Sequence, residues 1–170
     1  LATQNAIYDI TNGQMKKIYE NVNNEIKAFE INGANIFVAF NDKVVMIDSS
    51  NVESSVYPSE TDTYSNWFIS DMQYVDDSLY LLKVECADFS YFYGSEYWKG
   101  ELVRIKIDIS ETKSFTMLST NFGDENSFYS PLRFFAVRRD ELLIMDDGVV
   151  VEDWEIKQKN RLAIFNFDSM

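Results

Sequence analysis

The sequence has no histidine among its 170 residues, and this absence excludes several kinds of active site. Histidine is the commonest general base, a member of Ser-His-Asp and Cys-His catalytic groups, and a ligand of zinc and iron. The single cysteine, Cys86, allows no disulfide within the chain and no Cys-x-x-Cys redox or zinc motif. Carboxylates, tyrosines and lysines remain for acid–base chemistry, and we interpret Cys86 as a small hydrophobic residue.

Positive charge is also scarce in this chain. Lysine and arginine together number 15, against 28 aspartates and glutamates, which gives a net charge of −13. Such a charge repels phosphate backbones unless basic side chains gather in a local stripe. The sequence shows only isolated basic pairs, Lys16-Lys17 and Arg138-Arg139. We therefore expect no nucleic-acid partner.

Long apolar runs are missing as well, and none approaches the roughly 20 residues that a transmembrane helix needs. The hydrophobic fraction of 46% is nevertheless ordinary for a globular core, so the sequence predicts a folded, soluble chain without a membrane span. The chain begins at Leu1 and not at a methionine, so we expect a processed or excised chain. Together with segments rich in Tyr, Asn and Ser, this favours an extracytoplasmic location.

Short runs rich in Val, Ile, Phe and Tyr recur along the chain with turn residues between them, which predicts an all-β protein. The clearest turn is Asn12-Gly13, because a two-residue type I′ loop requires positive φ at both positions. It predicts a hairpin between strands at Ala6–Ile10 and Met15–Tyr19.

The segment from Met15 to Phe29 permits a second interpretation. Its apolar residues fall near helical spacing. However, Asn21, Asn23 and Asn24 interrupt it, and asparagine is a poor helix former. We therefore prefer a strand, an Asn-rich loop and a second strand here.

A unit of four strands recurs along the sequence. It consists of an alternating strand, a polar turn, an apolar strand, a strand that ends in an apolar-Asp pair, and a further short strand. The apolar-Asp pairs are Tyr8-Asp9, Ile47-Asp48, Ile107-Asp108 and Phe167-Asp168. Repeated units of four antiparallel strands are the plan of a β-propeller blade, with a β-sandwich as the alternative. The predicted organisation is one repeat domain over 1–170, with a blade end at 1–22, blades at 23–60 and 68–119, and an incomplete blade at 130–170.

The last unit resembles NHL-type β-propeller blades. It opens with Pro131 and the alternating strand Leu132–Val137, continues with Leu142–Gly148, and closes with Asn160–Phe165. The resemblance implies a propeller fold and a protein or RNA partner, of which the acidic charge favours the protein. Closed propellers have about four to eight blades, so the chain is expected to be part of a larger propeller. A small closed ring and an open array are the alternatives, and an open array allows self-association.

The long connections between the predicted strands all fall on one side of the blades, and they are aromatic and acidic. They span 57–67, 83–99, 121–129 and 146–160. Long loops on a rigid scaffold commonly carry function, and aromatic residues with acidic neighbours suit cationic or polyhydroxylated ligands. The alternative is that the aromatic residues pack the long hairpins together and that the charges solubilise them. The candidate ligand-binding residues are Trp67, Tyr91, Tyr93, Tyr97, Trp98, Trp154, Asp88, Asp146 and Asp147.

These features favour a non-catalytic binding or scaffold module for a protein, peptide or glycan, without a cofactor. The alternative is a carboxylate-dependent glycan-active enzyme, which needs two carboxylates at a defined separation. Candidates for that pair are Asp88, Glu96, Asp146 and Asp147. A Ca²⁺ site at Asp146-Asp147-Gly148 with Glu152 and Asp153 stays open, although the spacing is not that of an EF-hand.

Overall fold

The fold is all-β, as the sequence predicts. The computed structural model describes residues 1–57, 67–86, 98–107, 112–119, 131–138, 141–152 and 155–166. Within these ranges the chain forms thirteen strands and no helix. The strands are β1 (Ala6–Thr11), β2 (Gln14–Glu20), β3 (Ala28–Asn32), β4 (Asn35–Ala39), β5 (Val44–Ile47), β6 (Glu53–Tyr57), β7 (Trp67–Val75), β8 (Ser78–Cys86), β9 (Trp98–Ile107), β10 (Thr112–Ser119), β11 (Pro131–Arg138), β12 (Glu141–Glu152) and β13 (Glu155–Asn166).

The N-terminal segment confirms the predicted hairpin and excludes the helix. Asn12 and Gly13 have φ angles of 54° and 75°, as a type I′ turn requires. After β2, the side-chain oxygen of Asn21 accepts hydrogen bonds from the backbone N–H groups of Asn23 and Asn24, at 3.0 and 3.1 Å. These hydrogen bonds satisfy two backbone N–H groups without a helix, so a loop separates β2 from β3.

The strands form four antiparallel sheets in chain order. Sheet A is the β1–β2 hairpin, sheet B contains β3 to β6, sheet C contains β7 to β10, and sheet D contains β11 to β13. In sheets B, C and D every strand pairs with the next strand along the chain, so each sheet is a meander. Sheet B lies within the predicted unit 23–60, whereas sheet C runs from Trp67 to Ser119 and so begins one residue before the predicted unit 68–119.

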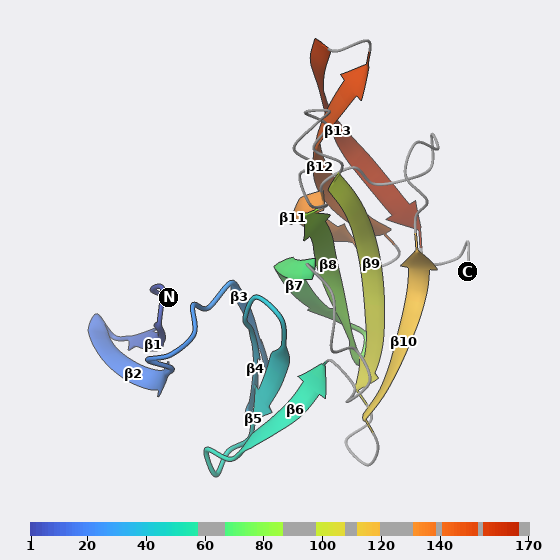
Figure 1. Ribbon diagram of the computed structural model, residues 1–170. Helices are drawn as coiled ribbons and strands as arrows, with labels where there is room; N and C mark the ends of the chain where they lie inside the picture. The colour runs from blue at the N-terminus through green and yellow to red at the C-terminus, as the bar shows by residue number, and fades with distance from the viewer. Residues whose placement is uncertain are drawn as a thin grey trace.

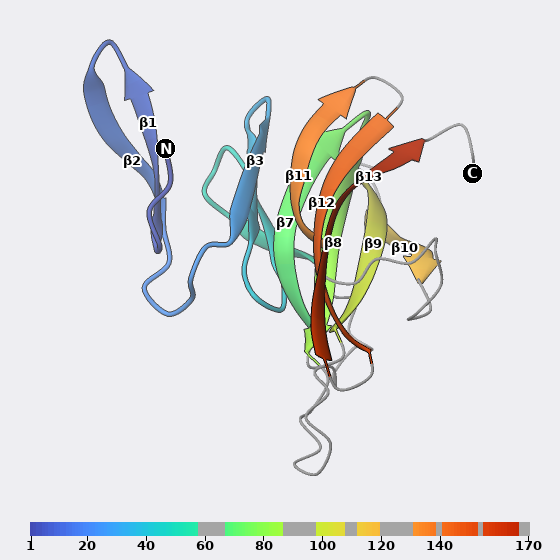
Figure 2. The same cartoon turned by 90° about the horizontal axis from the view of Figure 1, so that it is seen from above.

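The sheets pack face to face in the order A, B, C, D. Sheets A, B and C follow one another from left to right in Figure 2, where sheet D overlaps sheet C. Because side chains alternate along a strand, the apolar run of β4 places apolar side chains on both faces of sheet B. Phe37 and Ala39 join a core with sheet C, whereas Val38 joins a core that also contains Ile7 of sheet A. Both faces of sheet B are therefore apolar and covered.

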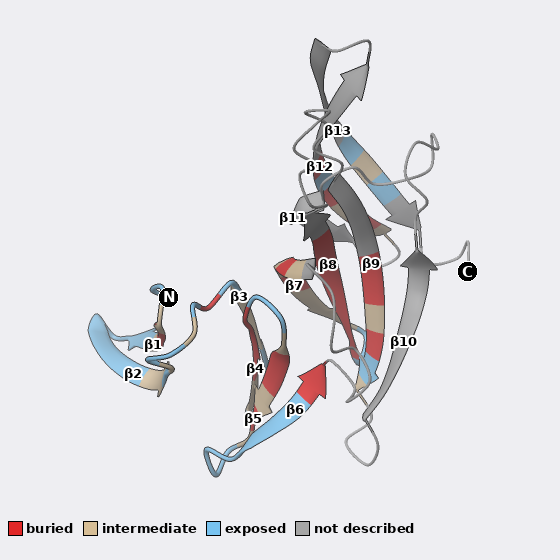
Figure 3. Cartoon of the chain, in the orientation of Figure 1, coloured by how far each residue is buried: buried red, intermediate tan, exposed pale blue. Residues whose placement is uncertain are grey.

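Sheet C shows the same alternation. Leu79 and Leu81 of β8 face sheet B, and Tyr80 and Leu82 face sheet D. The buried residues consequently run through the centre of the stack in Figure 3. Each interface between neighbouring sheets is a hydrophobic core, and burial of apolar side chains stabilises the stack.

The sheets are arranged as a fan. The first strands of the sheets lie side by side, because β7 contacts β3 on one side and β11 on the other. The last strands β6 and β10 make a much smaller contact. Successive sheets thus converge at their first strands and diverge toward their last strands (Figure 1).

The two long connections predicted after Leu82 and Met145 are shorter than expected, because the strands continue. β12 pairs with β13 as far as Glu152 and Glu155, and β8 extends to Cys86 opposite Trp98. The run Val149–Val151 explains the extension of β12, since β-branched residues favour strands. The ends of the 83–99 connection and most of the 146–160 connection are therefore hairpin arms.

Candidate functional site

Most of the predicted ligand-binding residues lie outside the described residues, so their role stays a prediction. They fall in the ranges 87–97 and 153–154 of the sequence. These residues are Asp88, Tyr91, Tyr93, Tyr97 and Trp154, together with Glu96 of the enzyme alternative.

Trp67 and Trp98 are strand residues and not loop residues. Trp67 begins β7 and pairs with Glu85, whereas Trp98 begins β9 and pairs with Cys86. The two tryptophans therefore flank the same end of β8. The fold therefore brings their backbones to one end of sheet C, and their role in binding stays a prediction.

The predicted loop position of Asp146 and Asp147 is wrong. Both lie within β12, opposite Arg161 and Asn160 of β13. Asp146 alternates in register with Leu142 and Ile144, which pack against sheet C, and it is 0% exposed. It cannot serve as an accessible ligand-binding residue. Within the described ranges, no three His, Cys, Asp or Glu side chains gather into a group that could hold a metal ion.

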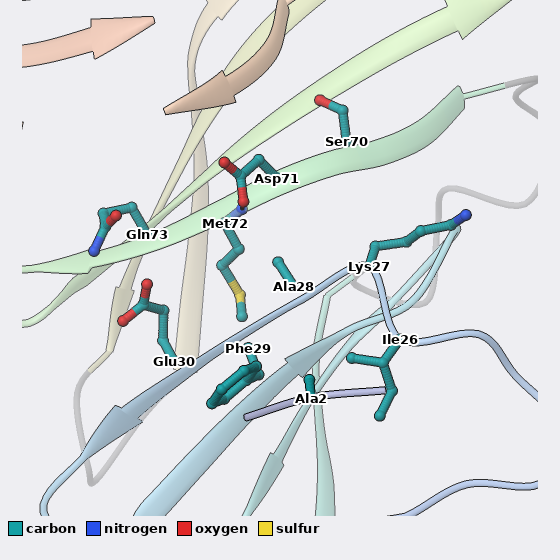
Figure 4. A pocket seen from close by; sticks show the side chains of 10 residues that line it. All are labelled: Ala2, Ile26, Lys27, Ala28, Phe29, Glu30, Ser70, Asp71, Met72 and Gln73. Carbon is teal, nitrogen blue, oxygen red and sulfur yellow. Dashed lines mark hydrogen bonds between the residues drawn. The ribbon is translucent and has the colours of Figure 1, made fainter. Parts of the chain in front are cut away.

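A pocket of about 460 Å³ lies where the first strand of sheet B meets the first strand of sheet C. Its walls come from β3, from the two residues before it, from β7 and from Ala2 near the N-terminus (Figure 4). The lining residues are Ala2, Ile26, Lys27, Ala28, Phe29, Glu30, Ser70, Asp71, Met72 and Gln73. The convergence of the fan thus places the pocket at the inner edges of two sheets.

A β-bulge in β7 shapes one wall of this pocket. The register changes between Ile69, which pairs with Lys83, and Asp71, which pairs with Leu82, so Ser70 is the extra residue. The Ser70 hydroxyl donates a hydrogen bond of 3.2 Å to the carbonyl oxygen of Leu82. Bulges of this kind redirect the side chains beside them, and here the residue beside the bulge is Asp71.

Tyr74 fixes the relative position of the two pocket strands. Its ring stacks on Phe37 of sheet B with centroids 5.5 Å apart and planes at 19°. Its hydroxyl accepts a hydrogen bond of 2.7 Å from the Asn32 side chain of β3 and donates one of 3.0 Å to Asp77. Burial and the Asp77 carboxylate raise the pKa of Tyr74 to about 12, so the hydroxyl keeps its proton.

Two carboxylates, Glu30 of β3 and Asp71 of β7, face the pocket from opposite walls. Burial raises the pKa of Glu30 to about 7, and the negative charge of Asp71 raises it further in the same direction. Lys27, the cation among the lining residues, bonds to Glu25 at 2.8 Å and points away from Glu30 (Figure 4). Asp71 Oδ1 also accepts a hydrogen bond of 2.9 Å from the backbone N–H of Met72. Two carboxyl groups therefore line the pocket, and that of Glu30 changes charge near neutral pH.

Neither Glu30 nor Asp71 was a candidate in the sequence analysis, which placed the candidate site in the long connections. Both residues could have been singled out from the sequence by one signal. A glutamate or an aspartate inside a strand is unusual when both faces of the sheet are packed. Their proximity carries no sequence signal, since it arises from the stacking of sheet B on sheet C.

Comparison of the chain with protein-family models, with curated proteins and with solved structures found no match. The function of the candidate site is therefore argued from its geometry alone. In the part of the chain that the structure describes, no helix could cross a membrane.

Proposed function

We propose that the protein is a non-catalytic binding module that takes a basic side chain of a peptide or protein into the pocket between β3 and β7. The observation that carries this proposal is the pair of carboxylates, Glu30 and Asp71, in one pocket with the ionisation of Glu30 suppressed. A lysine or arginine side chain supplies the positive charge that both carboxylates favour.

The raised pKa of Glu30 predicts how binding depends on pH. Below about pH 7 the free protein holds a proton on Glu30, and a bound cation must displace it. Above that value Glu30 is already ionised, so the pocket attracts a cation without releasing a proton. Affinity for a basic peptide should therefore rise as the pH rises through about 7.

The same proposal gives a role to the aromatic hairpins. A peptide anchored by its basic side chain extends past the pocket, and aromatic residues of the hairpins are then candidates to contact its neighbouring positions. We also propose that the sheets are blades of a β-propeller or of part of one. The stacking in chain order and the convergence of β3, β7 and β11 support this proposal.

Calorimetry with a lysine-containing hexapeptide tests the binding proposal, with the same peptide carrying acetylated lysines as the neutral control. Glu30→Gln and Asp71→Asn should each weaken binding of the basic peptide by about tenfold, which corresponds to about 1.4 kcal/mol. Asp42→Asn is the matched control, because Asp42 is an exposed acid outside the pocket. Equal affinity for both peptides, or an equal loss in all three variants, would contradict the proposal.

A second candidate function is carboxylate-dependent cleavage of a glycan at the same pair. The observation that favours it is the pKa of Glu30 of about 7, since a general acid must hold its proton near neutral pH. An assay of reducing-sugar release from a panel of oligosaccharides distinguishes the two functions. An enzyme would lose turnover in Glu30→Gln and still bind the oligosaccharide, whereas a binding module shows no turnover in either form.

A further inference from the structure

The pocket between β3 and β7 is lined by consecutive residues and not by alternate ones. One wall runs from Ile26 to Glu30, and the other runs from Ser70 to Gln73 (Figure 4). Side chains alternate between the two faces of a strand, so a cavity against one face touches every second residue. A cavity that touches each residue in turn lies against the edge of the strand, where the backbone is. The pocket therefore borders the edges of β3 and β7.

Both strands present backbone groups at these edges. β3 and β7 are the first strands of sheets B and C, and within the described ranges neither pairs with a strand on its outer side. At the start of each wall a backbone N–H group already bonds on that side. The N–H of Ile26 donates to the carbonyl oxygen of Gln4, and that of Ile69 donates to Asn41, each at 2.7 Å. An edge strand of this kind can pair with the main chain of an added peptide.

The position of Glu30 determines where a basic side chain would lie on such a peptide. Residues paired across two antiparallel strands point to the same face. On β3, Ala28 packs in the core between sheets B and C, and Glu30 lies two residues later on the same face. A lysine paired with Glu30 would therefore hold its ammonium group beside the Glu30 carboxylate and toward sheet C, where Asp71 lines the facing wall.

The two residues that flank Glu30 on β3 are apolar. Phe29 and Ile31 lie on the opposite face of the strand from Glu30. Phe29 packs against the core that joins sheets A and B, whereas Ile31 is 53% exposed. Residues on either side of the peptide's lysine would pair with Phe29 and Ile31 and point to the same face as they do. Apolar side chains at those two positions would cover Ile31.

We propose that the pocket binds an extended peptide with an apolar-basic-apolar sequence, which pairs antiparallel with β3 and places its basic residue opposite Glu30. This inference rests on the proposed function, to which it adds the conformation and the sequence of the peptide. The volume of about 460 Å³ agrees with it, since sites of about 300–1,000 Å³ hold a whole ligand. The positive charge of the peptide also suits a chain whose net charge is −13.

Fluorescence anisotropy with the intact chain and a labelled heptapeptide tests the conformation. The peptide carries a central lysine between two valines and serine elsewhere, and a series of variants carries one N-methyl group each. Backbone groups of a strand alternate in direction, so only every second N–H of the peptide bonds to β3. N-methylation at those alternate positions should weaken binding at least about tenfold, and N-methylation between them by less than about threefold. An equal effect at all positions, or no effect at any, overturns the proposal.

Substitution of Ile31 tests the sequence of the peptide. Ile31→Ser should weaken binding of the valine-flanked peptide at least about threefold and leave unchanged the binding of a peptide with serine in place of both valines. Val52→Ser is the matched control, since Val52 is 55% exposed and lies between β5 and β6 of the same sheet. It should bind both peptides like the native chain. An Ile31→Ser chain that binds the valine-flanked peptide normally contradicts the apolar flanks.

A single capped lysine, acetyl-lysine methylamide, separates this inference from the proposed function. It supplies the charge but no strand, so it should bind at least about tenfold more weakly than the heptapeptide. If it binds as tightly, and Glu30→Gln still weakens that binding, the pocket takes a basic side chain and the extended peptide is wrong. If neither the heptapeptide nor the capped lysine binds, the proposed function and this inference are both wrong.

Discussion

Replacement of Glu30 by glutamine should make the protein more stable at alkaline pH and leave its stability unchanged at acid pH. The pKa of Glu30 is about 7 in the folded chain, against an ordinary value of 4.5. Glu30 therefore keeps its proton to a higher pH in the folded state than in the unfolded state. The contribution of Glu30 to the free energy of unfolding is therefore largest below about pH 4.5 and is lost as the pH rises through about 7.

The magnitude follows from the difference between these two values. At about 1.36 kcal/mol per pH unit, the difference corresponds to a ceiling of roughly 3 kcal/mol. Glu30 is only half-buried and lines an open pocket, so screening by solvent reduces the effect to about 1–2 kcal/mol. Glutamine occupies nearly the same volume and stays neutral, so Glu30→Gln avoids this loss at high pH.

Urea unfolding of both proteins at about pH 4 and about pH 8 measures the effect. Glu30→Gln should gain about 1–2 kcal/mol at the higher pH and nothing at the lower pH. Asp42→Asn, at an exposed acid, controls for the change in net charge. A variant that is equally stable or less stable at high pH, or that gains the same amount at both pH values, would refute the assignment of Glu30 as a carboxyl group penalised by burial.

Three further substitutions test the fold. Tyr74→Phe keeps the stacking on Phe37 but removes the hydrogen bonds to Asn32 and Asp77, so it should lower the free energy of unfolding in urea by about 1 kcal/mol. Gly13→Ala should cost about 1 kcal/mol in thermal unfolding through its φ of 75° alone, because beyond the adjoining residues no atom lies within 4 Å of the added methyl group. Leu81→Ala removes a fully buried side chain between sheets B and C and should cost about 2–5 kcal/mol by calorimetry; a loss below 1 kcal/mol would place Leu81 outside the core.

The local features of the fold were predictable from short stretches of sequence. Asn12-Gly13 determines its own hairpin, since the required backbone angles belong to those two residues alone. The apolar run of β4 likewise predicts a strand, and apolar residues on both of its faces indicate that the strand is covered twice. The four-stranded units could be predicted from such runs, because each strand within a sheet pairs with the next strand in the chain.

The errors occurred where local composition and long-range pairing disagree. Asp146, Asp147 and Gly148 have the composition of a loop, yet β13 supplies a pairing partner for each of them and β12 continues through the segment. The pair of Glu30 and Asp71 was missed for a related reason. These residues belong to different sheets, and only the packing of one sheet on the other brings them to the same pocket.

The stacking of the sheets in chain order also determines how the protein should come apart. Each of the three hydrophobic cores joins one sheet to the next, so stability is approximately a sum of nearest-neighbour contributions. Sheet A is covered on one face by a small core and exposes most of β2, so it should open first. Amide hydrogen exchange should then be fastest in β1 and β2 and slowest in β4 and β8, where both faces are protected. The molecule should therefore respond to stress as a series of separable layers, with loss of the outermost layer preceding global unfolding.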